Sequence, residues 1–220
     1  MNIYELFEKV MLGSSKSGHY GHKGIPGHQG GSAAGGVVAG VDFGRLDIEY
    51  EMRGMNDNAR EIKKKANELF DRGHWERKDF NAVSGYTLKE FRTINSDLRA
   101  DELSSLTKRR VKVIDKLFES APPLKEDLYV YRGRPHPGTG DIHDKAYVST
   151  SMSAQAAASF GAGDWGERDY NKVIRIKIPS GSKVVYAGGI TQNEEKQFEV
   201  LLPRNTMLKN IGGSEYEYAG

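Results

Sequence analysis

The chain has 220 residues, of which 37% are hydrophobic and 28% charged, and this composition is typical of a soluble globular protein. Its net charge of +2 at pH 7 gives no general reason to expect nucleic acid or an anionic membrane as a partner. The sequence contains no cysteine, which excludes disulfides, thiolate metal ligands and a thiol nucleophile.

The N-terminal part of the chain differs in composition from the rest. The stretch from Gly13 to Gly40 is rich in glycine and serine and has few side chains that could pack into a core. This composition predicts a flexible Gly/Ser/His-rich segment over residues 1–40 and a folded domain over residues 41–220. Three histidines lie in the segment: His19, His22 and His28. No regular element would hold them together, so we expect no metal site.

Residues 41–121 are expected to form a helical lobe. In DNAREIKKKANELFDRG, apolar side chains recur at helical spacing, Asp57 is a suitable N-cap and Gly73 a suitable end. A second apolar stripe marks a further helix and consists of Leu88, Phe91, Ile94 and Leu98. The basic run Lys108–Arg110 is interpreted as a solvated helix face.

Residues 122–220 are expected to form a β core. Short runs with strand-like alternation are separated by turns that contain glycine or proline: DLYVYRG, AYVSTSMS, KVIRIKIP, KVVYAG and QFEVLLP. Helices come first and strands follow, which predicts an α+β fold. In the last run, strand periodicity would place Gln197, Glu199 and Leu201 on one face.

Three features of these strands suggest chemistry: Arg132 before a glycine, the cluster Ser149–Ser151, and the pair Gln197 and Glu199. Each feature alone is ordinary for a sheet edge or a turn. An arginine offers a planar fork of donors to a phosphate. A carboxylate that faces a sugar can stabilise an oxocarbenium-like transition state. Together, these groups suit cleavage of an N-glycosidic bond in a dinucleotide.

The order of these motifs resembles that of the Arg–Ser–Glu class of ADP-ribosyltransferases. The motifs are YRG at residues 131–133, STS at 149–151, and QFE at 197–199 followed by VLLPR. The upstream segment YTLKEFRTINSDLR resembles a helical signature of the clostridial Rho-modifying exoenzymes and the binary actin-modifying toxins. This resemblance implies two packed antiparallel β-sheets that form an NAD cleft, with a flanking N-terminal helical lobe. It also implies NAD as the substrate and no metal.

The resemblance implies a role for each matching residue. Glu199 would be the catalytic carboxylate that stabilises positive charge on the nicotinamide ribose, and Ser149 would position it. Arg132 would bind an NAD phosphate, and the backbone of Gly133 would contact the carboxamide. The other residues implied in the NAD site are Asn95, Arg99, Thr150, Ser151 and Phe160. Phe160 has the alternative of an ordinary core residue.

Gln197 bears on the acceptor of the ADP-ribose. In the resembling class, the residue two positions before the catalytic glutamate faces the acceptor, and a glutamate there accompanies arginine acceptors. A glutamine favours a side chain such as asparagine or glutamine, since an amide can hydrogen-bond an amide. We therefore expect a mono-ADP-ribosyltransferase that modifies a host macromolecule. The favoured acceptor is a protein, at a residue other than arginine.

Three alternatives stay open. The same site could act as an NAD glycohydrolase with water as acceptor. Nucleic acid could be the acceptor, because residues 58–116 carry 15 Lys and Arg against 10 Asp and Glu. A structural phage head protein could carry the domain as an inactive NAD-binding module.

A second resemblance concerns GHYGHKGIPGHQGGSAAGG, which is similar to Gly/His-rich stretches of tailed-phage head-associated proteins. It implies a phage-encoded enzyme that acts in the cytoplasm of a bacterial host and contacts head proteins in the virion through residues 1–40. A delivered bacterial effector or toxin is the alternative. No apolar run is long enough for a transmembrane helix, so we expect no membrane partner.

Overall fold

The computed structural model describes residues 57–220, except residue 71 and the ranges 135–139, 162–168, 189 and 191–196. All of the described residues belong to one compact unit of the chain, Gly40–Gly220. The predictions for residues 1–40, including those for the three histidines, lie outside the described residues.

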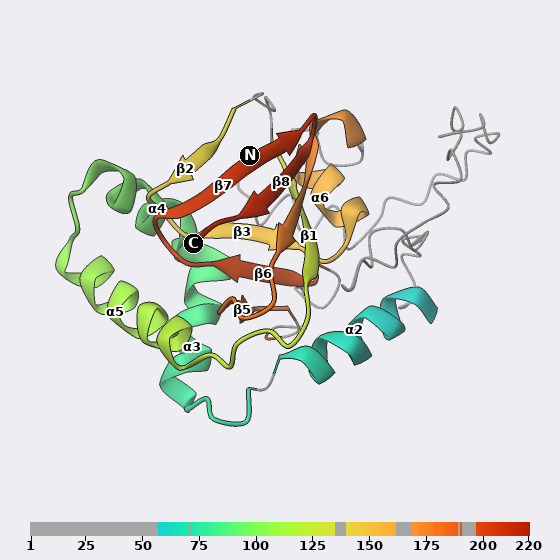
Figure 1. The fold of residues 1–220 in the computed structure, drawn as a ribbon. Coiled ribbons are helices and arrows are strands. Elements are labelled where there is room, and N and C mark those ends of the chain that lie inside the picture. The colour runs from blue at the N-terminus through green and yellow to red at the C-terminus, as the bar shows by residue number, and fades with distance from the viewer. Residues whose placement is uncertain (1–56, 71, 135–139, 162–168, 189, 191–196) are drawn as a thin grey trace, which may run out of the picture. The chain divides into compact units, whose positions relative to one another are not determined.

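Five helical elements come first in the described chain (Figure 1): α2 (Asp57–Leu69), α3 (Arg77–Gly85), the π-helical η2 (Tyr86–Glu90), α4 (Phe91–Ala100) and α5 (Ser105–Ser120). Asp57, predicted as the N-cap of the first helix, is already part of α2, which ends at Leu69, before Gly73. Local capping explains two of the other boundaries. At the start of α5, the Ser104 hydroxyl accepts a hydrogen bond from the Thr107 amide at 3.1 Å. Helix α4 ends where Asp101 adopts a left-handed conformation with φ of 59°.

The stripe of apolar residues predicted for the second helix extends over two elements, because a π turn joins α3 to α4 without interrupting the helix. Ile94 and Leu98 are buried on the predicted face, whereas Leu88 and Phe91 are half-buried. Such π insertions are rare in proteins as a whole, but those that occur often lie at functional sites. The insertion therefore directs attention to the residues around η2.

The strands follow, with the short helix α6 (Ala154–Gly161) and the 3₁₀ turn η3 (Tyr170–Lys172) between them. They are β1 (Leu128–Gly133), β2 (Ile142–Asp144), β3 (Val148–Ser151), β4 (Val173–Ile178), β5 (Val185–Tyr186), β6 (Glu199–Leu202), β7 (Thr206–Gly212) and β8 (Glu215–Tyr218). The α+β class is confirmed. The sequence pattern identified five of these strands; β2, β7, β8 and α6 were not predicted.

The observed sheet differs in two details from the two packed antiparallel sheets that the resemblance implies. All of them belong to one hydrogen-bonded sheet in the order β2-β7-β8-β4-β1-β3-β6-β5, and β4 pairs with β8 in parallel. The two halves of the sheet meet where β1 pairs with β3, at Tyr131 opposite Ser151. Strands β1, β3 and β6 are therefore consecutive neighbours.

Two hydrophobic clusters hold the helices and the sheet together. The first is formed by residues of both sheet halves and of α2, among them Ile62, Val130 and Val200. The second joins α3, η2, α4 and α5 to the strands and includes Ile114, Tyr147 and Leu201. Burial of one such aliphatic side chain contributes roughly 1.5–3 kcal/mol. Because Val200 and Leu201 enter different clusters, β6 connects the two cores.

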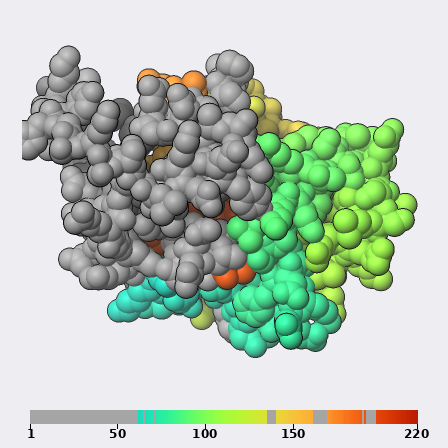
Figure 2. Space-filling model, turned by 180° about the vertical axis from the view of Figure 1, so that it is seen from behind, coloured from blue at the N-terminus to red at the C-terminus, as the bar shows by residue number. Residues whose placement is uncertain are grey.

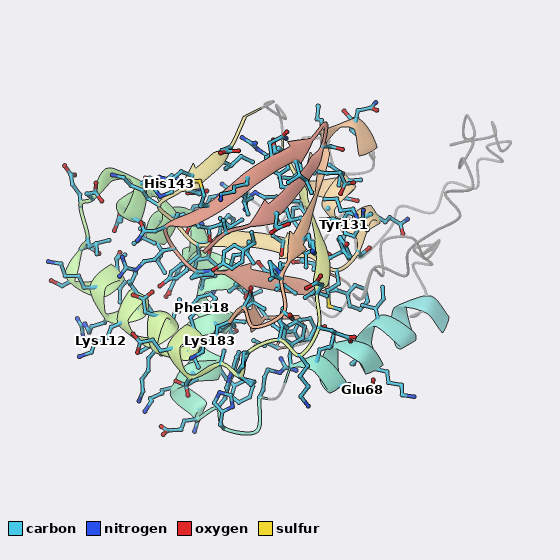
Figure 3. All side chains as sticks on the ribbon, viewed as in Figure 1. Glu68, Lys112, Phe118, Tyr131, His143 and Lys183 are labelled. Carbon is cyan, nitrogen blue, oxygen red and sulfur yellow. The ribbon has the colours of Figure 1, made fainter. Side chains whose placement is uncertain are left out.

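The helices form a large part of the molecular surface on the face opposite to that of Figure 1 (Figure 2). On α5, Lys112 is exposed and points away from the strands, whereas Phe118 is buried and lies toward them (Figure 3). In the basic run, Lys108 and Arg109 are exposed as predicted, whereas Arg110 is half-buried and pairs with Glu90 of η2 at 2.9 Å. Among the helices that the structure describes, none is long and apolar enough to span a membrane.

Candidate active site

Six of the predicted site residues lie on the neighbouring strands β1, β3 and β6, among them Arg132, Ser149 and Glu199. Arg132, near the end of β1, is half-buried and donates from Nη1 to the main-chain oxygen of Ser149 at 3.0 Å. Ser149 lies on β3 opposite Leu201 of β6. Glu199 is the first residue of β6 and is only 9% exposed. The sheet thus places a guanidinium, a hydroxyl and a carboxylate on adjacent strands.

The backbone around Glu199 is fixed from both sides. The main-chain oxygen of Glu199 accepts hydrogen bonds from the amides of Ala187 at 2.9 Å and Gly188 at 3.1 Å. On the other side, Ser151 pairs with Glu199 in the β3–β6 ladder, and the Ser151 hydroxyl donates to the main-chain oxygen of Gln197. The carboxylate therefore projects from a backbone segment that has little freedom to shift.

The predicted strand relation between Gln197 and Glu199 is wrong. Gln197 lies in a turn, β6 begins only at Glu199, and Phe198 between them has a left-handed φ of 47°. A bulky residue in this region costs of order 1–3 kcal/mol and persists only where its surroundings fix it. Here the ring of Phe198 is 1% exposed, and its main-chain oxygen accepts from the Met152 amide at 3.0 Å. The relative direction of the two side chains is set by this turn and not by strand alternation.

Tyr86 of η2 connects the helices to these strands. Its hydroxyl and the side-chain amide of Asn95 hydrogen-bond each other at 3.0–3.2 Å, and the side chain of Ser149 lies near the hydroxyl. Burial and the negative charge of Glu199 raise the pKa of Tyr86 far above its ordinary value, although Arg132 acts in the opposite direction. The phenol therefore stays protonated at neutral pH and acts as a neutral hydrogen-bonding group.

The contact between Tyr86 and Asn95 depends on the π turn. The two residues are nine positions apart, which a regular α-helix of 3.6 residues per turn would place about 180° apart around its axis. The wider turn of η2, at Tyr86–Glu90, changes this phase. Tyr86 was not among the predicted site residues, although it opens the segment YTLKEFRTINSDLR in which Asn95 was identified.

Arg99 and Asp144 form an ion pair at the edge of this group. The Arg99 guanidinium donates twice to the Asp144 carboxylate, from Nε at 3.0 Å and from Nη2 at 2.8 Å. Burial acts to raise the pKa of Asp144, but the hydrogen bonds from Arg99 and the Ala146 amide, with the charges of Arg99 and Arg132, hold it below its ordinary value. A planar guanidinium that binds a carboxylate in this way has the geometry for a phosphate. Asp144 was not predicted from the sequence.

The remaining predicted residues have different surroundings. The Thr150 hydroxyl is buried and donates to the Val200 main-chain oxygen at 2.7 Å, so it supports the β3–β6 pair. Gly133 ends β1 opposite Val173. Phe160 is 46% exposed on α6, which disagrees with the alternative of a core residue. Within the described ranges, no group of three or more His, Asp or Glu side chains could hold a metal ion.

The site is suited to a substrate that carries both phosphates and a sugar. Arg132 and Arg99 supply positive charge, and both interact electrostatically with Asp144. Glu199 supplies a nearly buried carboxylate beside the neutral hydroxyl of Tyr86. In a partly desolvated site, a carboxylate interacts with developing positive charge more strongly than it would in water.

Comparison with protein families gives one match. The family model described as ADP-ribosyltransferase exoenzyme matches residues 56–137 and 138–215, which together span most of the chain. The matched ranges include the strand residues, Tyr86 and Asn95. No curated protein matches the chain.

Several solved structures resemble the fold. Plx2a, an ADP-ribosyltransferase toxin from Paenibacillus larvae, is 21% identical with a TM-score of 0.59, and the match covers 74% of this chain and 97% of that chain. An ADP-ribosyltransferase from Clostridium botulinum is 23% identical with a TM-score of 0.56, covering 74% and 94% of the two chains. The C3 exoenzyme of Clostridium limosum is 22% identical with a TM-score of 0.54, covering 73% and 92%. These matches show that the chain shares the fold of the three proteins.

Proposed function

This chain belongs to the ADP-ribosyltransferase exoenzyme family, and we propose that it transfers the ADP-ribose of NAD to a side chain of a host protein. The family identifies the class, a NAD-dependent mono-ADP-ribosyltransferase, and NAD as its substrate. The observation that supports our site assignment is the placement of Arg132, Ser149 and Glu199 on the neighbouring strands β1, β3 and β6, where the Arg132 guanidinium donates to the main-chain oxygen of Ser149.

In the proposed reaction, the bond between nicotinamide and the ribose breaks and its electron pair leaves with nicotinamide. Positive charge then develops on the ribose, and the carboxylate of Glu199 stabilises it in the transition state. The acceptor atom forms the new bond to the same ribose carbon and loses its proton to solvent. Tyr86 and Ser149 hold the carboxylate side of the site in place, and neither has to exchange a proton.

Arg132 and Arg99 are proposed to hold the phosphates of NAD. Burial lowers the pKa of Arg132, yet an arginine stays charged at neutral pH because its ordinary pKa is far above 7. Arg99 already binds a carboxylate through two hydrogen bonds, and a phosphate oxygen pair could take the same position. The proposed NAD contacts of Asn95, Gly133, Thr150, Ser151 and Phe160 remain predictions.

The acceptor is proposed to be a residue other than arginine, and Gln197 supports this. An amide at this position can hydrogen-bond an amide acceptor but cannot deprotonate a guanidinium. Gln197 is half-buried and its main-chain oxygen is fixed by the Ser151 hydroxyl. We further propose that the enzyme acts in the cytoplasm of a bacterial host, with residues 1–40 as a separate N-terminal segment that contacts phage head proteins; delivery as a toxin is the alternative.

Incubation with labelled NAD and a bacterial lysate tests this proposal. The expected result is a discrete labelled protein that does not appear with Glu199→Gln, with the label on asparagine or glutamine by mass spectrometry. Label on arginine would contradict the role of Gln197. Label that nuclease removes would identify a nucleic-acid acceptor, and nicotinamide release without any labelled product would indicate a glycohydrolase.

A further inference from the structure

A cationic side chain outside the described site is tied to the backbone of Glu199. Arg72 follows the end of α2, and its Nη1 donates to the main-chain oxygen of Gly188 at 3.1 Å. The amide of the same glycine donates to the main-chain oxygen of Glu199 at 3.1 Å. One residue, Gly188, therefore links the Arg72 guanidinium to the strand residue that carries the proposed catalytic carboxylate.

The guanidinium of Arg72 lies over two aromatic rings. It lies 5.4 Å from the centroid of the Tyr186 ring and 5.9 Å from that of Trp75. The Tyr186 ring is in turn stacked on Phe70, with centroids 5.2 Å apart and an angle of 14° between the planes. A guanidinium in such a position is attracted to the negative face of each ring. The side chain is thus fixed in position as well as hydrogen-bonded.

Gly188 shows how closely this arrangement is packed. A Cβ atom at Gly188 would lie 2.6 Å from atoms of the Tyr186 ring. That ring cannot retreat freely because Phe70 and Arg72 lie against it. Because Gly188 has no side chain, its backbone can lie against the Tyr186 ring. In this position its main-chain oxygen accepts from Arg72 and its amide donates to the main-chain oxygen of Glu199.

We propose that Arg72 is a positioning residue for catalysis: through the backbone of Gly188 it sets the place of the Glu199 backbone, and hence of the carboxylate. This inference rests on the proposed function of Glu199. A displacement of about 1 Å in a catalytic group can reduce a rate 100-fold, so a modest relaxation of this backbone is sufficient for a measurable effect. Arginine is required because one planar group makes the hydrogen bond and both ring contacts.

The test compares release of nicotinamide from NAD by the full chain and its variants, with affinity measured on a non-hydrolysable carbocyclic NAD analogue. For Arg72→Gln we expect kcat about 10-fold lower and analogue affinity within about 2-fold of wild type. Arg72→Lys, which can still donate to the Gly188 oxygen, is expected to recover part of kcat. Gly188→Ala is expected to lower kcat in the same way, because it displaces the Tyr186 ring.

Arg175→Gln provides the matched control. The Arg175 guanidinium of β4 lies 4.0 Å from the centroid of the Tyr129 ring of β1 and pairs with Glu215 of β8 at 3.2 Å, and none of these three strands pairs with β6. This variant is expected to lose thermal stability and to keep kcat. It separates a general loss of packing from a loss of positioning.

The possible outcomes distinguish the positioning role of Arg72 from the catalytic role of Glu199. Wild-type kcat in Arg72→Gln and Gly188→Ala, or a loss confined to analogue affinity, would overturn the positioning role and leave the proposed function intact. Glu199→Gln is measured in the same assay. If that variant keeps its turnover, the assignment of Glu199 fails, and the role of Arg72 fails with it.

Discussion

The strand side and the helix side of the site are held in place by different means. Arg132, Ser149 and Glu199 lie on hydrogen-bonded strands, and backbone pairing fixes their positions whatever their side chains are. Tyr86 and Asn95 lie on a helix with a π turn, and a hydrogen bond between their own side chains fixes them. Substitutions on the strand side should therefore affect chemistry, whereas those on the helix side should affect chemistry and stability together.

The largest effect is expected for Glu199→Gln, which tests the strand side of this comparison. The substitution keeps the shape of the side chain and removes its charge, so kcat for nicotinamide release should fall at least about 100-fold. Affinity for the carbocyclic NAD analogue and the melting temperature should change little, because the β3–β6 pairing does not involve the carboxylate. A large drop in melting temperature would show that the strand side also depends on its side chains.

Tyr86→Phe tests the helix side and should have the next largest effect. Removal of the hydroxyl leaves the buried amide of Asn95 without this partner, which costs about 1–3 kcal/mol. We expect a lower melting temperature and kcat/KM reduced about 10-fold. Differential scanning calorimetry and nicotinamide release measure the two effects.

Tyr147→Phe is the matched control for that prediction. Tyr147 is equally buried and contacts the Tyr86 ring edge-on at 5.5 Å, but its hydroxyl donates to Asp115 and to the Val111 main-chain oxygen, both on α5. It should lose stability without losing activity. Equal losses of activity in the two variants would mean that the effect of Tyr86 is one of packing alone.

The smallest effect is expected for Asp144→Asn, which removes the carboxylate that holds Arg99. The ion pair between Asp144 and Arg99 should stabilise the fold by about 1 kcal/mol or less, since the Arg99 side chain is 49% exposed. The pKa of Asp144 is lowered in the folded protein, so this stabilisation is present above the ordinary value of 3.8 and is lost as pH falls through the lowered pKa. Melting temperatures of wild type and variant should differ at pH values above 3.8 and should approach each other as the pH falls below 3.8. A difference that persisted at the acidic end would contradict this account.

The contrast between the two sides also explains what the sequence could predict. Arg132, Ser149 and Glu199 stand in short strands whose alternation is visible in the sequence, so their strands were identified correctly. The sequence does not predict the turn at Phe198. No local pattern indicates an aromatic residue in the left-handed conformation, because only tertiary packing can hold it there. Nor does helical periodicity reveal that Tyr86 and Asn95 meet, since their contact requires a π turn. Asp144 lies in a strand of three residues, too short to show a period.

The most direct test of the account is whether the helix side and the strand side act as one unit. A double-mutant cycle of Tyr86→Phe and Ser149→Ala, measured as kcat/KM for nicotinamide release, gives their coupling. Residues in direct contact are typically coupled by about 0.5–3 kcal/mol. We therefore expect the double variant to retain at least about 2-fold more activity than the product of the two single losses predicts. Losses that simply multiply would contradict the account, because Tyr86 would then not join the helices to the catalytic strands.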